Sequence, residues 1–431
     1  MRIITNCLRS DWNELTQRPV IHDAALPATV QGILAQVRDG GDAALRELTR
    51  RFDGAVPDSF RVSVAQRDAC TQTVPHDLRQ AIVAAKTYIE KFHRSQNQVE
   101  PPVTTAKGVT CFRRSVPIER VGIYIPAGTA PLFSTLLMLG VPAKVAGCRE
   151  IVLSTPGGRE ATLNPAIAFC AQLLGIDEIY LVGGAQAVAA LAYGTESIKP
   201  VSKICGPGNR YVTEAKLQVG AQGVAIDMPA GPSEVLVIAD EGANPRCVAA
   251  DLLAQAEHGP DSQVVLVACS HALVECVLEQ VTLQTAQLPR QEVVREALEK
   301  SFALVVESID EALEFANLYA PEHLILSVEE PERLVEKVTN AGSVFLGYWA
   351  AEALGDYASG TNHVLPTNAA ARAYSGVSVD TFVKKVTFQS VSRGGLLELS
   401  DAVVTLARAE GLEAHAQAVV VRREAKVDGG Q

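Results

Sequence analysis

Short apolar runs alternate with helix-like segments over most of this chain, and this alternation limits the possible folds most strongly. The runs begin at Arg120, Glu150, Glu178 and Val201, and then at Glu234, Ser262, Phe302, Glu322 and Gly342. Strands separated by helices of this length pair in parallel through βαβ units. The pattern therefore predicts an α/β protein with two Rossmann-like open sheets, incomplete because no G-x-G-x-x-G stretch is present.

The ends of the chain read as small helical segments. Residues 28–52 have apolar residues at helical spacing around a break at Gly40-Gly41, and a second helical pattern starts at Asp77. After Val379 the strand pattern stops, and the remaining residues read as helices without strands. We therefore expect an N-terminal segment 1–25, a first α/β domain 26–120 with 234–378, a second α/β domain 121–233, and a C-terminal helical segment 379–431.

Composition excludes several classes of protein. The 431 residues carry a formal net charge of −11, which disfavours a nucleic-acid-binding surface. No stretch reaches the roughly 18 uncharged apolar residues of a membrane helix, and the N-terminus lacks the apolar core of a signal peptide. The nine cysteines are spread singly, which disfavours a disulfide framework. We expect a cytoplasmic protein, in which Cys148 is a buried apolar residue and not a nucleophile.

Three loops between strands and helices contain Gly or Pro followed by small polar residues. They read YIPAGTAPLFST, LVGGAQAVAAL and ICGPGNRYVTEAK. Such loops allow close approach of the backbone to a phosphate at a helix N-terminus, and they also occur as ordinary tight turns. Both interpretations remain open from the residues alone.

Several polar groups stand next to apolar segments. Glu322 and His323 directly precede an apolar run, where an unpartnered acid or imidazole would cost several kcal/mol. Gln255 and His258 share one face at the end of a helix, where the histidine can also be a simple helix cap. The other candidates are Asp227 and Ser233 in a Pro/Gly-rich turn, Asp356 and His363 in an irregular loop, and Glu410 and His415 in a helical stretch.

Taken together, these stretches resemble the histidinol dehydrogenase family. The motifs GPGNRYVTEAK, AIDMPAGPSEVLVIAD, LLAQAEHGPDSQV, APEHL and GDYASGTNHVLPT occur in the family's order and at its spacing. The resemblance extends from about Ala28 to Val420. It implies oxidation of L-histidinol to L-histidine through an aldehyde, with two NAD⁺ consumed and a bound zinc ion.

The resemblance also implies roles for individual residues. Glu322 and His323 match the catalytic pair, with Glu322 activating water and His323 acting as general base. The implied zinc ligands are Gln255, His258, Asp356 and His415. The implied NAD contacts are Tyr124, Gln186 and Asn209, and the implied substrate contacts are Ser233, Glu410 and His323 together with the four zinc ligands.

The family is a homodimer in which the C-terminal segment crosses to the other subunit. Glu410 and His415 would therefore serve the partner's site. The chain departs from the family pattern at Ala127, where a glycine is expected, and in the looser LGYWAAEALGDY stretch, which retains Asp356. Two other functions remain alternatives: a zinc hydrolase in which Glu322 activates water for attack on an amide, and a non-catalytic ligand-binding relative.

Overall fold

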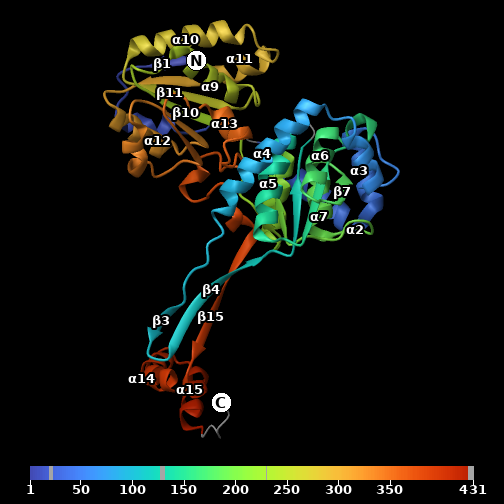
Figure 1. Cartoon of the computed structure of the whole chain (residues 1–431), viewed down its shortest axis with the longest axis vertical. Coiled ribbons are helices and arrows are strands. Elements are labelled where there is room, and N and C mark those ends of the chain that lie inside the picture. Colours follow the sequence, from blue (N-terminus) through green and yellow to red (C-terminus); the bar gives the residue numbers. More distant parts are fainter. Residues whose placement is uncertain (19–22, 127–131, 230, 426–431) are drawn as a thin grey trace. The chain divides into compact units, whose positions relative to one another are not determined.

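The computed structural model describes residues 1–18, 23–126, 132–229 and 231–425 (Figure 1). Ala127, the departure from the family's loop, lies outside the described residues. The chain forms two compact units. The first contains Met1–Gln96 and Ile118–Phe382, and the second contains Asn97–Pro117 and the chain from Val383 onward.

The first of two parallel sheets in the large unit is built mainly from the second half of the chain. Its strands, in spatial order, are β1 (Arg2–Ile4), β12 (Phe302–Val305), β11 (Gln263–Ala268), β10 (Glu234–Ala239), β13 (His323–Ser327) and β14 (Ser343–Leu346). Both faces are buried, because Val235 and Val237 pack into one apolar cluster while Leu236 and Ile238 pack into another.

Helices cover both faces of this sheet. The Val235 face packs against α9 (Pro245–Ala256), α10 (His271–Thr285) and α11 (Gln291–Glu299). The opposite face packs against α12 (Ile309–Tyr319) and Trp12 of the short α1 (Trp12–Leu15), whose indole meets the Phe315 ring edge-on. In register, Val235 of β10 pairs with His323 of β13, so the start of β13 lies beside the start of β10.

The second sheet uses the middle of the chain. Its order is β2 (Arg61–Val62), β7 (Glu178–Leu181), β6 (Glu150–Thr155), β5 (Arg120–Tyr124), β8 (Lys203–Cys205) and β9 (Ala225–Ile226), parallel except for β2. One face carries α4 (His76–Arg94), α5 (Phe133–Ala146) and α6 (Pro165–Leu173). The other carries α2 (Leu26–Asp53), α7 (Gly184–Tyr193) and α8 (Arg210–Ala221), while α3 (Val64–Thr71) packs on α6.

The remaining elements are short or belong to the second unit. The large unit also has α13 (Glu352–Tyr357) and the 3-10 turns η1 (Arg9–Asp11), η2 (Gly158–Glu160), η3 (Pro331–Lys337), η4 (Ala370–Arg372) and η5 (Val379–Phe382). The second unit contains an antiparallel sheet of β3 (Val103–Ala106), β4 (Val109–Pro117) and β15 (Val383–Val391), followed by α14 (Arg393–Ala409) and α15 (Glu413–Glu424).

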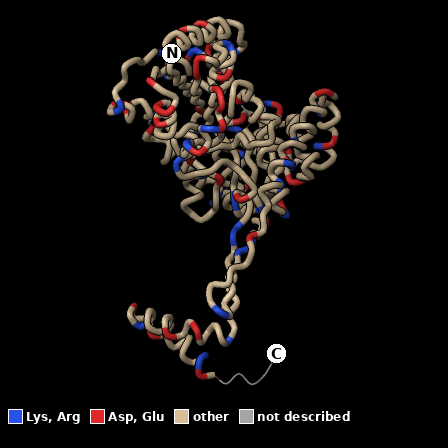
Figure 2. The backbone as a smooth tube through the Cα atoms, turned by 60° about the vertical axis from the view of Figure 1, so that its left-hand side comes forward, with Lys and Arg blue, Asp and Glu red and all other residues tan. Residues whose placement is uncertain are grey.

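The predicted fold class is confirmed: the chain is α/β with two open, mostly parallel sheets. The predicted break in the first long helix is also present, because Gly41 has the non-helical angles φ 52° and ψ −138° inside α2. In the described part of the chain no helix is both long enough and apolar enough to span a membrane. Lys and Arg are interspersed with Asp and Glu along the backbone (Figure 2).

The expected domain boundaries differ from the structure in two places. We expect residues 26–120 to belong with 234–378, but α2, α3 and α4 pack on the helices of the middle sheet, and β2 pairs with β7. The apolar faces of these three helices show that each is buried on one side. They do not show which of the two sheets it covers, so hydrophobic periodicity cannot assign the helices to a sheet. We expect the segment 379–431 to lack strands, but it contains β15, nine residues long. This strand pairs with β4, which lies far away in the sequence.

Candidate active site

Glu322 and His323 follow a sharp turn at the end of α12. The turn is made by Ala320, which has a left-handed conformation (φ 53°, ψ 64°) that is strained for a residue with a side chain. Pro321 follows, and His323 is the first residue of β13. Burial begins before the apolar run, because Pro321, Glu322 and His323 are all buried. Glu322 and His323 are only 6 % and 3 % exposed.

Burial of Glu322 is compensated by a hydrogen bond. Its Oε2 atom accepts the Glu234 backbone N–H at 2.9 Å. The Gln255 amide lies beside it, oriented so that its nitrogen donates to Glu352 and its oxygen accepts the Glu234 N–H at 2.8 Å. Burial raises the pKa of Glu322 to about 8, against the lowering effects of His323 and of the Glu234 N–H. A carboxyl group with a pKa near neutrality can both accept and release a proton, as acid–base catalysis requires.

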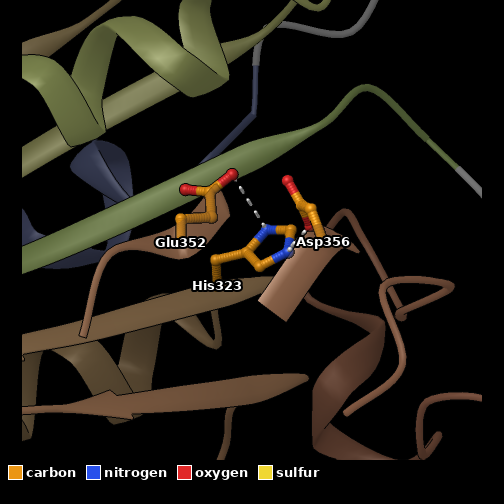
Figure 3. A group of neighbouring side chains, drawn as sticks. All are labelled: His323, Glu352 and Asp356. Atoms are coloured by element: carbon orange, nitrogen blue, oxygen red, sulfur yellow. Dashed lines mark ion pairs between the residues drawn. The ribbon is translucent and has the colours of Figure 1, made fainter. Parts of the chain in front are cut away.

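The His323 imidazole lies between two acidic side chains of α13 (Figure 3). Its Nδ1 is 3.9 Å from Glu352 Oε1, and its Nε2 is 3.7 Å from Asp356 Oδ1. Burial lowers the pKa of His323, but Glu352, Glu322 and Asp356 outweigh burial and raise this pKa to about 10. Among the described residues Nε2 has no hydrogen-bond partner, so this nitrogen is available to a ligand.

Glu352 was not identified from the sequence. It is fully buried, and burial raises its pKa to about 8. A signal was present, because Glu352 and Asp356 are four residues apart in AEALGDY and therefore share one face of α13.

Three of the four predicted zinc ligands line one cavity of about 150 Å³ together with Glu322 and His323. These ligands are Gln255, at the end of α9, His258, just beyond it, and Asp356, in α13. His258 Nδ1 donates to the Ala254 carbonyl at 3.1 Å, which leaves Nε2 free for a metal, the arrangement usual for histidine ligands. The fourth predicted ligand, His415, is an exposed residue of α15 in the second unit. Glu410, at the end of α14, is exposed in the same unit.

The donor atoms in this cavity fit a divalent metal. Imidazole nitrogen and amide or carboxylate oxygen suit zinc, and His258, Gln255 and Asp356 bring donors of these kinds to one cavity. His323, Glu352 and Asp356 also place one donor atom each within 4.8 Å of one another. Asp356 is common to both sets, so a metal bound here would contact or neighbour the proposed general base.

Ser233 and His363 line the same cavity. His363 Nδ1 donates to the Asp356 carbonyl at 2.8 Å, so its Nε2 is the atom that accepts from the Thr135 hydroxyl at 3.0 Å. The ring thereby connects α5 to the α13 turn that carries Asp356. Burial lowers the pKa of His363, which favours this neutral form.

The three predicted NAD contacts follow the carboxyl ends of strands in the middle sheet. Tyr124 ends β5, and its hydroxyl accepts the Gly184 N–H at 3.0 Å at the start of α7. Gln186 is 1 % exposed, and its side-chain nitrogen has no partner among the described residues. Asn209 caps α8, with Oδ1 accepting the N–H groups of Tyr211 and Val212. This capping role is enough to explain an asparagine at position 209. The cap uses only Oδ1, so it does not occupy the side-chain nitrogen.

Asp53 is a further acid near these loops that the sequence did not reveal. It ends α2 and accepts a hydrogen bond from the Gly183 backbone, and its other oxygen, Oδ2, is buried without a partner among the described residues. Burial raises the pKa of Asp53. No local pattern indicates this contact, because Asp53 comes from a helix about 130 residues before the loop that it meets.

A buried ion pair fixes the loop after β8. Lys216 and Asp227 are 3 % and 2 % exposed and form a direct pair. Lys216 also donates to the Gly206 carbonyl at 2.8 Å, and Asp227 accepts the Gly206 N–H at 2.7 Å. Both polar groups of Gly206 are therefore held by charged side chains, which fixes the turn that leads to Asn209.

Comparison with known proteins identifies the family. The family model of histidinol dehydrogenase matches residues 16–423. Histidinol dehydrogenase from Xylella fastidiosa (strain Temecula1) is 51 % identical over 422 residues, covering 96 % of this chain and 98 % of the relative. The protein of that name from Bacteroides thetaiotaomicron is also 51 % identical, covering 98 % of this chain and 99 % of the relative.

A solved structure agrees. The crystal structure of histidinol dehydrogenase from Elizabethkingia anophelis matches with a TM-score of 0.97 at 50 % identity, covering 98 % of both chains. This chain belongs to the histidinol dehydrogenase family. The resemblance drawn from the motifs is thereby confirmed, and the cavity just described is the candidate active site of a family member.

Substitution of Gly206 tests the geometry of the loop after β8. Its φ is +126°, and a Cβ atom there would lie 2.0 Å from the Tyr124 carbonyl oxygen. We expect Gly206→Ala to displace the loop and to lower the free energy of unfolding by about 2 kcal/mol or more. Gly32→Ala is the control, because a Cβ at Gly32 of α2 meets nothing within 4 Å. Denaturant unfolding measures both, and a Gly206→Ala protein as stable as the control would contradict the described turn.

Proposed function

We propose that this chain oxidises L-histidinol to L-histidine through L-histidinaldehyde, with two NAD⁺ reduced in sequence and with zinc required. The observation that carries the proposal is the burial of Glu322 and His323 beside Gln255, His258 and Asp356 in one cavity. Membership of the histidinol dehydrogenase family supports the substrate. An acid, an imidazole and a set of metal-binding donors are the groups that this chemistry needs.

Zinc would be held by Gln255, His258, Asp356 and the His415 of a second copy of the chain. When bound, it would supply Lewis acidity and grip the imidazole and amine of the substrate, which orients the reacting carbon. The hydrogen bond from His258 Nδ1 to Ala254 supports this assignment, because it fixes the ring with Nε2 free. Ser233 and Glu410 are proposed as further substrate contacts.

The two proton transfers are assigned to the adjacent pair. His323 would accept the hydroxyl proton of the alcohol while hydride leaves the same carbon, once a metal cation held at Asp356 offsets the acids that raise the pKa of His323 to about 10. The aldehyde must next be hydrated, because a second hydride can leave only from a carbon bearing another oxygen. Glu322 would take a proton from that water, which suits a carboxyl whose pKa is raised to about 8 by burial.

NAD⁺ would accept the two hydrides from the substrate carbon. Tyr124, Gln186 and Asn209 are the proposed contacts, because they stand at the carboxyl ends of β5, β7 and β8, the edge where parallel sheets bind nucleotides. The buried, unpartnered nitrogen of Gln186 supports a polar ligand in that position. We further propose a cytoplasmic location, consistent with nine free thiols.

The stoichiometry of NADH formation tests the whole proposal. Purified protein with L-histidinol and excess NAD⁺ is expected to give two NADH per histidinol, measured by absorbance with histidine quantified in parallel. Chelation should abolish the reaction and added Zn²⁺ should restore it, since the ligands alone cannot hold the substrate. One NADH with accumulating aldehyde would contradict the double oxidation, and amide cleavage without NADH would indicate a hydrolase.

Replacement of His323 by asparagine separates the general base from the metal site. His323→Asn should lower kcat by about 10²- to 10⁴-fold, because the proton acceptor is lost while the proposed ligands remain. The zinc content, measured by atomic absorption, should stay close to that of the unmodified protein. Loss of zinc in this variant would show that His323 is itself a ligand. The metal would then be held by the group of His323, Glu352 and Asp356.

The proposed dimer is tested by complementation between two inactive variants. We mix His323→Asn with His415→Asn, unfold and refold them together, and assay the mixture. If each site combines His323 of one subunit with His415 of the partner, mixed dimers contain one intact site, and activity should recover to about one quarter of the unmodified level. Each variant refolded alone is the control. No recovery in mixed dimers, verified by affinity tags, would contradict a site shared between subunits.

A further inference from the structure

Glu234 is a buried acid that the proposed mechanism does not use. It is 2 % exposed, begins β10, and directly follows Ser233. Its Oε2 atom accepts a hydrogen bond from Arg18 Nε at 2.6 Å, and its Oε1 atom accepts one from the Asn368 backbone N–H. Both carboxylate oxygens are therefore used inside the molecule.

Arg18, from the N-terminal segment, is fixed as firmly as the acid that it pairs with. Its side chain is 7 % exposed, and its guanidinium stacks on the Tyr319 ring at 3.4 Å from the centroid. It also donates to the Thr16 carbonyl at 2.8 Å and to the Ala320 carbonyl at 3.4 Å. Ala320 is the left-handed residue that turns the chain into Glu322 and His323, so Arg18 contacts that turn directly.

The main chain of Glu234 contacts both members of the catalytic pair. Its N–H donates to Glu322 Oε2 at 2.9 Å, and its carbonyl oxygen is 3.4 Å from His323 Nδ1. A shift of Glu234 would therefore move the hydrogen-bond partners of Glu322 and His323 together. The side chain of Glu234 opposes such a shift, because its carboxylate is held by Arg18 and by the Asn368 N–H.

A structural role alone does not require an ion pair here. Burying two charges costs about as much as their attraction returns, so an apolar pair of similar size would stabilise the fold equally well. An ion pair with a planar guanidinium does supply direction, since each of its N–H groups fixes one acceptor. Direction is what a catalytic pair needs, because a misplacement of about 1 Å can cost about 10²-fold in rate.

We propose that Arg18 and Glu234 are positioning residues that hold Glu322 and His323 in the geometry for proton transfer. This inference rests on the proposed function of the catalytic pair. Neither side chain touches the substrate in this account. Arg18 acts through Glu234 and the Ala320 turn, and Glu234 acts through its own backbone groups.

The kinetic test uses three variants of the full-length, zinc-loaded protein. In Arg18→Met the Glu234 carboxylate loses its charged partner, and in Glu234→Gln the new amide N–H₂ faces the Arg18 donors. Both should lower kcat by about tenfold or more, with KM for NAD⁺ within about twofold and zinc content unchanged. Arg18→Lys restores the charge without the fork, so its kcat should be intermediate. A lysine variant no better than Arg18→Met would count against the proposal.

Arg120→Met is the matched control. Arg120 is also a largely buried arginine paired with an acid, with NH1 donating to Glu178 at 2.9 Å, but it starts β5 at the amino end of the middle sheet. Its loss should lower the Tm while kcat stays within about twofold. If Arg18→Met behaves in the same way, losing stability but keeping kcat, the proposed positioning role is wrong.

NMR of the His323 ring tests the positioning role without an activity measurement, so its result does not depend on the proposed function. The eight histidines are labelled with ¹⁵N in metal-free protein, and the His323 signals are assigned with His323→Asn. Glu234→Gln should shift the His323 Nδ1 resonance, whereas Arg120→Met should leave it unchanged. An unchanged resonance in Glu234→Gln overturns the inference, even if histidinol proves not to be the substrate.

Should Arg18→Met fail to fold, the double variant Arg18→Met/Glu234→Gln removes the unpaired buried charge and is measured in its place. A kcat within about twofold of the unmodified protein in that variant would also overturn the proposal. A loss of about tenfold or more, with normal zinc content, would support it.

Discussion

Three acids and one imidazole are buried together around the start of β13, and much of the nearby structure serves to accommodate them. Glu322, His323 and Glu352 are almost fully inaccessible, and Asp356 lies beside them. Unpartnered, such groups would cost several kcal/mol each, so the chain must supply hydrogen bonds and shared protons. The Glu234 backbone, the Gln255 amide and the strained turn at Ala320 provide that environment. The strain and the burial are located at the site of the proposed chemistry, as expected of functional sites.

The two sheets of the large unit present different edges to their proposed ligands. Tyr124, Gln186 and Asn209 follow the carboxyl ends of their strands, as the general rule for open parallel sheets predicts. Glu234 and His323 instead begin β10 and β13, so the proposed catalytic pair lies at the amino edge of its sheet. The rule therefore agrees with the proposed cofactor loops but not with the position of the proposed catalytic pair. The motif order, rather than sheet geometry, points to the proposed catalytic pair.

The sequence contained enough information for the strands, the sheets and most of the cavity, because these depend on local apolar patterns and on short motifs. It could not assign α2 to α4 to a sheet, since their apolar faces specify burial and not a partner. It also missed β15, whose mostly exposed residues lack a continuous apolar run and pair with the distant β4. Glu352 had a usable signal in its four-residue spacing from Asp356, while Asp53 had none.

Contacts between distant segments are the part of the site that no local pattern describes, and the N-terminal segment shows why this matters. Arg18 and Glu234 are 216 positions apart, so their pairing follows only from the completed fold. The segment is tied to the same sheet at a second point, because β1 pairs with β12 and Trp12 packs on Phe315 of α12. Tyr319, which stacks on Arg18, ends that same helix just before the turn that leads to Glu322 and His323. Residues 1–18 thus form part of the support of the candidate active site, although their sequence alone predicts only a short segment before the first long helix.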